Sequence, residues 1–118
     1  MSDSKPRIQV HQAGKITQAD LVDDVITDEA VIRDIADELY RLVAHDPQLK
    51  LVINFEKVGF LSSAAFGLLV SVGKRIRETE GALRLCCICP SIMEGFVITR
   101  LDREFKIVGT VEEAIASF

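Results

Sequence analysis

Polar and hydrophobic residues alternate near the start of the chain. Residues 7–12 alternate with the period of a β-strand, which predicts a half-exposed strand. Ala13 and Gly14 are expected to form a turn, and residues 16–22 are expected to form a second strand. Residues 1–6 show no such pattern, so we expect them to be disordered.

A helical period follows. Thr27 is suitably placed to cap the first turn, and the helix is expected to end near His45 and Asp46, because Pro47 disfavours helical geometry in the residue before it. The hydrophobic residues at helical spacing are Val31, Ile35, Leu39 and Leu42.

Two nearly continuous apolar runs, residues 51–55 and 83–88, are typical of strands that helices bury on both faces. Residues 64–79 between them predict a helix, which Gly81 is placed to end. The core-facing residues of this helix are expected to be Ala65, Leu68, Leu69, Val72 and Ile76.

The last part of the chain contains two capping-box patterns. Residues 91–94 predict the start of a helix that carries Ile92, Phe96 and Val97 inward. Residues 105–108 predict a short strand. Residues 110–113 predict a C-terminal helix that runs to Ser117 or Phe118.

The expected order is therefore β-β-α-β-α-β-α-β-α. Strands that alternate with helices predict an α/β fold, with about four helices covering a mostly parallel or mixed sheet of four to five strands. The sequence contains no internal repeat, linker or low-complexity tract, so residues 1–118 are expected to form a single domain.

Composition and charge argue against several classes of function. The net charge of −4 argues against a nucleic-acid partner, which requires a basic surface. No apolar run reaches the length of a membrane helix, and the N-terminus lacks the apolar core of a signal peptide. We therefore expect a cytoplasmic protein that does not insert into membranes.

The three cysteines, Cys86, Cys87 and Cys89, crowd one apolar stretch. This spacing fits neither a disulfide framework nor a metal site, and His11 and His45 lie far away in the sequence. We expect buried, reduced thiols and no bound metal.

No pattern of catalytic residues is present. The sequence contains no metal-binding HExxH motif, no phosphate-binding lysine loop and no histidine that the sequence connects to Ser63 as a general base. The aspartates at positions 20, 23 and 24 are interpreted as a solvated loop rather than a divalent-ion site. The sequence therefore predicts a non-catalytic protein without a cofactor.

The segment 58–67 joins a buried strand to the central helix. In an α/β sheet, such a loop lies at the carboxyl end of a strand, where functional residues tend to gather. Either Ser62 or Ser63 can cap the helix. Two interpretations of these serines are open: they only cap the helix, or they form a functional site.

From this point to the C-terminus the chain resembles the STAS domains of bacterial anti-sigma factor antagonists. The similarity covers about residues 50–118. It is carried by the apolar strand, the Phe60-Leu61-Ser62-Ser63 turn, the segment from Gly81 to Leu85, Pro90 followed by a helix, the segment Thr99-Arg100-Leu101-Asp102, and the closing helix with Val111-Glu112-Glu113-Ala114.

In these antagonists the turn typically reads Asp-Ser-Ser-Gly or Asp-Ser-Thr-Gly, and a partner kinase phosphorylates the serine after the aspartate. The resemblance places Ser62 at the aspartate position and Ser63 at the phosphoacceptor position, with Ser62 as the rival acceptor. Ala64 replaces the second Ser or Thr, and Ala65 replaces the glycine.

The resemblance implies a signalling protein that regulates transcription through protein partners. These are a serine kinase that acts as the anti-sigma factor, and a phosphatase. The unmodified protein is expected to bind its partner and the phosphorylated protein to release it. The expected partner-binding residues are Ser62, Ser63, Ala64, Phe66, Gly67, Val70 and Ser71, although Phe66 and Val70 can instead complete the core.

Two further functions are compatible with the sequence. One is a constitutive STAS scaffold in a signalling or lipid-transport complex, without phosphorylation. The other is a nucleotide-binding domain, although the sequence shows no phosphate-binding loop. We expect a monomer or a weak homodimer, because the first strand is free to pair.

Overall fold

The computed structural model describes residues 6–118 and centres on a mixed five-stranded sheet. The strands run in the order β1-β2-β4-β6-β7, and only β1 is antiparallel to its neighbour. Their bounds are β1 Ile8–Ala13, β2 Ile16–Leu21, β4 Lys50–Asn54, β6 Ala82–Cys86 and β7 Lys106–Val108. The expected mixed α/β fold is confirmed.

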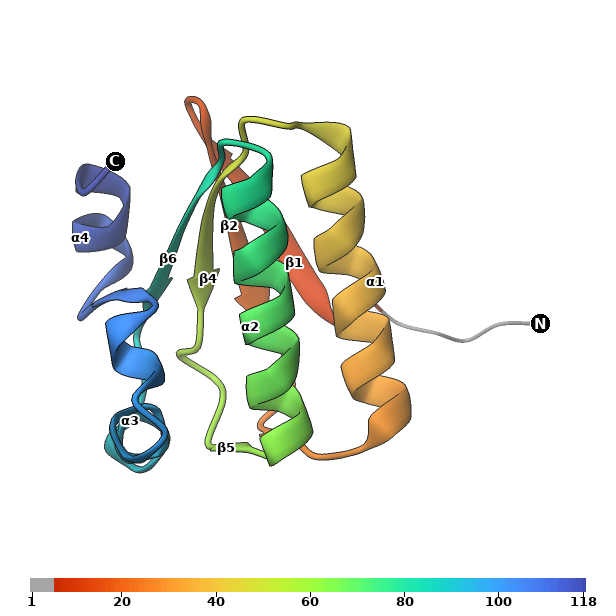
Figure 1. Cartoon of the computed structure of the whole chain (residues 1–118), viewed down its shortest axis with the longest axis vertical. Helices are drawn as coiled ribbons and strands as arrows, with labels where there is room; N and C mark the ends of the chain where they lie inside the picture. The colour runs from red at the N-terminus through yellow and green to blue at the C-terminus, as the bar shows by residue number, and fades with distance from the viewer. Residues whose placement is uncertain (1–5) are drawn as a thin grey trace.

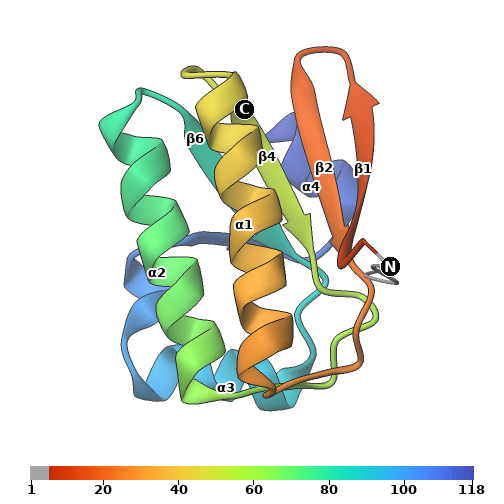
Figure 2. The same ribbon diagram turned by 90° about the vertical axis from the view of Figure 1, so that its right-hand side faces the viewer.

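The helices cover both faces of the sheet. Figure 2 shows α1 (Glu29–His45) and α2 (Ser63–Glu78) in front of the sheet, with α4 (Val111–Ala116) behind it. The fourth α-helix, α3 (Pro90–Ile98), lies at the end of the molecule where α2 begins (Figure 1). No helix within residues 6–118 is long and apolar enough to span a bilayer.

Three short elements had no counterpart in the sequence pattern. The strands β3 (Val25–Ile26) and β5 (Phe60–Leu61) pair in parallel as a separate two-stranded sheet. A single 3-10 turn, η1 (Leu101–Arg103), precedes β7. Their absence from the prediction follows from their length, because two or three residues cannot establish a period.

The central strand β4 is buried from both sides. Leu51 and Ile53 belong to the larger core under α1 and α2, and Val52 belongs to a smaller core with Cys86 under α4. The continuous apolar runs in the sequence are explained by this double burial.

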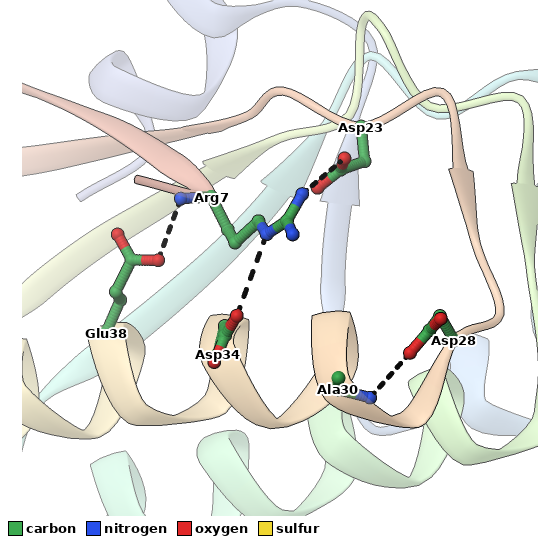
Figure 3. Close-up of polar contacts among 6 residues, drawn as sticks. All are labelled: Arg7, Asp23, Asp28, Ala30, Asp34 and Glu38. Carbon is green, nitrogen blue, oxygen red and sulfur yellow. Dashed lines mark hydrogen bonds and ion pairs between the residues drawn. The ribbon is translucent and has the colours of Figure 1, made fainter. Parts of the chain in front are cut away.

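The first turns of three helices test the predicted caps. Helix α1 is capped by Asp28 rather than Thr27, because the Asp28 carboxylate accepts a 2.7 Å hydrogen bond from the Ala30 N–H (Figure 3). The capping box expected at residues 91–94 is wrong. Helix α3 begins one residue earlier, with Pro90 in its first turn after Cys89. The cap predicted at Thr110 is confirmed.

Helix α3 also differs from prediction in which residues it buries. Ile92 and Phe96 are buried as expected, but Val97 is exposed. Helix α3 has only nine residues and packs one stripe of them against the core. Val97 lies outside that stripe.

Backbone geometry ends β6 and α2. The left-handed φ of 61° at Cys87 ends the strand at Cys86, before the expected Ile88. Glu80, with a φ of 64°, provides the left-handed residue after α2. Gly81 is needed for a different reason: a Cβ atom there would lie 2.6 Å from the Leu49 carbonyl oxygen.

Arg7 ties the start of β1 to two other segments (Figure 3). Its backbone N–H donates to Glu38 on α1 at 2.8 Å, and its guanidinium lies 3.2 Å from Asp23 and 3.8 Å from Asp34. Asp20, on β2, accepts hydrogen bonds from neighbouring side chains. Asp20 and Asp23 are therefore structural, which corrects their interpretation as a solvated loop. Residues 1–6 were expected to be disordered, and residues 1–5 of that segment lie outside the described residues.

Candidate functional site

The turn before α2 is fixed by hydrogen bonds to a distant segment. The N–H groups of Gly59 and Phe60 donate to the Asp24 carbonyl at 2.7 and 3.2 Å, and the Ser62 N–H donates to the Ile26 carbonyl at 3.0 Å. A Cβ atom on Gly59 would lie 2.8 Å from the Asp24 carboxylate. The turn is thus held against β3 before the helix begins.

Ser62 and Ser63 play different parts at the start of α2. Ser62 is the N-cap: its backbone is extended, and its Oγ accepts a hydrogen bond of 3.3 Å from the Ala65 N–H. Ser63 is the first residue of the helix and is exposed, and its hydroxyl forms no hydrogen bond within residues 6–118. Of these two serines, Ser63 is the one that is accessible and whose hydroxyl has no partner among the described residues.

The structure gathers the expected partner-binding residues along one side of α2. Ser63, Ala64, Gly67 and Ser71 are exposed. We call these four residues the α2 face. Because they recur at about one-turn intervals, a partner could contact them together.

Phe66 and Val70 lie at the border between the α2 face and the core. Both are half-buried and pack against the larger core. The Phe66 ring meets the Phe96 ring edge-on, with centroids 4.9 Å apart. It also fills the space beside Gly95, where a Cβ atom would lie 2.8 Å from the ring. These contacts fix α3 against α2, and a part of each side chain stays accessible.

Two exposed apolar pairs lie outside the residues that the sequence suggested. Val25 and Phe60 are opposite each other in the β3–β5 pair and are 55% and 54% exposed. Val97 and Ile98 end α3, and Ile98 is 72% exposed. For α3 the available signal was its many apolar residues, of which Val97 was expected to face inward with Ile92 and Phe96.

Cys89 caps α3 beside the serine turn. Its Sγ lies 3.4 Å from the Ser91 Oγ and 4.0 Å from the Gly59 carbonyl oxygen. The hydrogen bond with Ser91, supported by the Ile92 backbone, lowers the pKa of the Cys89 thiol. Burial, together with the nearby Cys87, raises the pKa of Cys86 to about 12.

The three thiols are free, but only Cys86 is buried; Cys87 and Cys89 are half-buried, contrary to expectation. Within residues 6–118, no cluster of three or more His, Cys, Asp or Glu side chains is arranged to hold a metal ion.

One cleft lies away from the serine turn. It has a volume of about 890 Å³ and opens where β4 and β6 begin, near the ends of α1 and α2. Its basic side chains, Lys15, Arg41, His45 and Lys50, face Asp46 and Glu80 in the same cleft. His45, in the last turn of α1, complements the dipole of that helix, since cations are favoured near the C-terminal end.

The fold and the serine turn can be compared with known families. The family model of the STAS domain matches residues 26–114. The chain therefore belongs to the STAS domain family.

Its fold is that of the anti-sigma factor antagonists. An antagonist STAS domain protein from Planctomyces limnophilus is 27% identical, with a TM-score of 0.79 over 93% of this chain and 96% of that one. The Bacillus cell fate determinant SpoIIAA, in its phosphorylated form, is 19% identical, with a TM-score of 0.73 over 93% of this chain and 97% of that one.

A curated relative carries the same assignment. BtrV of Bordetella bronchiseptica, assigned to the anti-sigma factor antagonists, is 29% identical over 69 residues, which are 58% of this chain and 60% of that protein. The match thus spans about three fifths of the relative's length. The sequence resemblance to this family is confirmed.

Proposed function

We propose that this protein is a non-catalytic, cytoplasmic anti-sigma factor antagonist, and that phosphorylation of Ser63 releases its partner. The observation that supports this most directly is the exposed Ser63 hydroxyl on the first turn of α2. The adjacent Ser62 hydroxyl is already engaged as the helix cap. A kinase could therefore modify Ser63 without breaking a hydrogen bond of the fold.

The start of α2 is suited to hold a phosphate. The first turn of α2 contains no acidic residue, whereas α1 begins with Glu29 and α4 with Glu112 and Glu113. Phosphorylation adds about −1.5 to −2 charge, which the helix N-terminus and its dipole favour. The modified protein should remain folded.

The same charge would act against a partner. A phosphate on Ser63 would add charge to the α2 face, three residues after the exposed Phe60. Burying that charge in an interface costs desolvation unless the partner supplies a counter-charge. We expect the partner to be a serine kinase with anti-sigma activity, and a phosphatase to restore binding.

The acceptor is tested by intact mass after incubation with the partner kinase and ATP. Wild-type protein should gain one phosphate, Ser63→Ala should gain none, and Ser71→Ala, which removes another exposed serine of α2, should behave as wild type. A gain that survives in Ser63→Ala but disappears in Ser62→Ala would move the acceptor by one residue.

A constitutive scaffold is the second candidate. It is favoured by two residues of the turn, because Ser62 and Ala65 stand where the phosphorylated antagonists carry aspartate and glycine. In that case the wild-type protein would gain no mass but would still bind its partner through the α2 face. An affinity measurement with and without ATP separates the two candidates.

A further inference from the structure

The two edges of the sheet differ in how they are protected. The edge strand β7 is three residues long and carries Lys106. The other edge strand, β1, has six residues, and the four from Gln9 to Gln12 are exposed. Edge strands are normally shortened, charged or bulged to prevent pairing with another chain. β1 contains no Lys, Arg, Asp, Glu, Pro or Gly, and its register with β2 is unbroken.

The ladder with β2 fixes which groups of β1 face outward. The Val22 N–H donates to the Arg7 carbonyl at 3.3 Å, so the Arg7 carbonyl points toward the β2 side of the ladder. Residues of an antiparallel strand alternate between bonding inward and pointing outward. Ile8, Val10 and Gln12 therefore direct their backbone N–H and C=O groups away from β2, and no residue within 6–118 pairs with them.

We infer that a second copy of this chain pairs with β1, antiparallel across a two-fold axis, with Val10 opposite Val10. In this register Ile8 of each copy pairs with Gln12 of the other. All the outward-pointing backbone groups of Ile8, Val10 and Gln12 are then satisfied. The two sheets become one continuous sheet.

The neighbouring registers satisfy fewer groups. A pair centred on Gln9 places Gln12 opposite Pro6, which has no N–H to donate. A pair centred on His11 places Ile8 opposite Gly14, in the turn between β1 and β2 where the backbone has a φ of 64°. Only the register centred on Val10 keeps every pair within the strand.

The side chains of β1 favour its own copy as the partner. Val10 is 46% exposed, and in the inferred register it covers its counterpart about 5.5 Å away between Cα atoms. On the opposite side of the sheet, Gln9 lies across from His11, so no two like charges face each other in this register. Each copy supplies the same surface, as a two-fold interface requires.

The association should be weak and should depend on concentration, because one strand pair buries less than the ~1,200 Å² of a standard interface. Figure 2 shows β1 at the sheet edge beyond β2, away from α2. The dimer would therefore present two separate α2 faces. This inference does not rest on phosphorylation, so either can fail without the other.

Sedimentation velocity under reducing conditions tests the dimer. The sedimentation coefficient of the wild-type protein should rise with concentration. Val10→Lys should weaken self-association by ~10-fold or more, because two like charges then face each other. Val25→Lys, which places the same charge on an exposed valine of β3, should behave as wild type. A wild-type protein that stays monomeric, or a Val10→Lys variant that still associates, overturns the inference.

Mixing variants of opposite charge at position 10 tests the register. Val10→Glu and Val10→Lys should each be monomeric alone, and an equal mixture should form a heterodimer because opposite charges then pair. Without this recovery, the register centred on Val10 is wrong. Amide exchange gives an independent reading: the N–H groups of Ile8, Val10 and Gln12 should exchange more slowly in concentrated wild-type samples.

Discussion

Ser62 and Ser63 are adjacent and chemically identical, but their hydroxyl groups have different surroundings. The Ser62 Oγ accepts a hydrogen bond from an N–H group at the start of α2, whereas Ser63 is exposed and its Oγ forms no hydrogen bond within residues 6–118. Both positions were candidates for the cap in the sequence. Only the backbone geometry separates them, because the extended ψ of 169° at Ser62 places its side chain over the first turn.

We predict that Ser62→Ala lowers the free energy of unfolding by about 1 kcal/mol, the usual cost of a lost N-cap. Ser63→Ala should change it by less than ~0.5 kcal/mol, because the hydroxyl has no partner to lose. Urea unfolding followed by circular dichroism measures both. Equal losses in the two variants would show that the cap is shared.

The cysteines should differ in reactivity because their pKa values shift in opposite directions. The lowered pKa of Cys89 means that its thiolate persists at lower pH than that of an ordinary cysteine. Cys86, with its pKa raised to about 12, remains a protonated, buried thiol. Iodoacetamide should therefore label Cys89 first at neutral pH, and label Cys86 only in denaturant.

Mass spectrometry of time-resolved digests locates the label, and Cys89→Ser is the control. The rate at Cys89 should fall as the pH drops through its lowered pKa. Ser91→Ala should shift that fall to higher pH, because it removes the hydrogen bond that favours the thiolate. Labelling of native Cys86 at the same rate as Cys89 would contradict this assignment.

At the scale of elements, the long periodic segments were predictable. The hydrophobic stripe of α2 and the apolar runs of β4 and β6 were visible in the sequence because the buried residues of these elements recur at regular intervals or in unbroken runs. In contrast, β3 and β5 exist because they hydrogen-bond to each other across a large separation in the sequence. Their pairing depends on how the rest of the chain folds, so no local pattern could identify them.

Alanine substitutions at Gly67, within α2, and at Gly81, just after it, should change the stability of the fold in opposite directions. At Gly81 the added Cβ would lie 2.6 Å from the Leu49 carbonyl oxygen and 3.0 Å from Ile76, so Gly81→Ala should cost ~1–3 kcal/mol. At Gly67 no atom lies within 4 Å of the added Cβ, so Gly67→Ala should gain ~0.5–1 kcal/mol of helix stability.

Thermal melts of both variants provide the comparison. Gly67→Ala should also weaken partner binding, since Gly67 belongs to the α2 face. Because this variant is expected to be more stable than wild type, a loss of binding could not be attributed to unfolding. A melting temperature that rises in Gly81→Ala would show that the α2–β6 turn relaxes without cost.

At the scale of the whole molecule, the position of the serine turn was predictable but its surroundings were not. A strand followed by serines and a helix places the turn at the carboxyl end of the sheet. The exposed Val25 reaches the turn through the β3–β5 pair, which places it opposite Phe60, and α3 adjoins the turn through the contact of Phe66 with Phe96. Such neighbours are set by tertiary packing, so the sequence could not reveal them.

The proposed switch requires that charge at Ser63 changes binding and leaves the fold intact, and Ser63→Asp tests both. A carboxylate in the first turn of α2 should leave stability unchanged or raise it by ~0.3–1 kcal/mol, because the helix dipole favours negative charge there. Affinity for the partner should fall at least ~10-fold, because an unpaired charge must be desolvated in the interface.

Ser71→Asp is the matched control for this variant. It adds the same charge to the exposed side of α2, two turns beyond the helix N-terminus, where the dipole gives little stabilisation. Denaturation of the three proteins measures the effect on stability, for which Ser71→Asp is the control. Calorimetric titration of wild type and Ser63→Asp measures the effect on binding, for which Ser71→Asp is no control because Ser71 belongs to the α2 face. A Ser63→Asp variant that is both stable and fully active in partner binding would show that negative charge at this turn is not the switch.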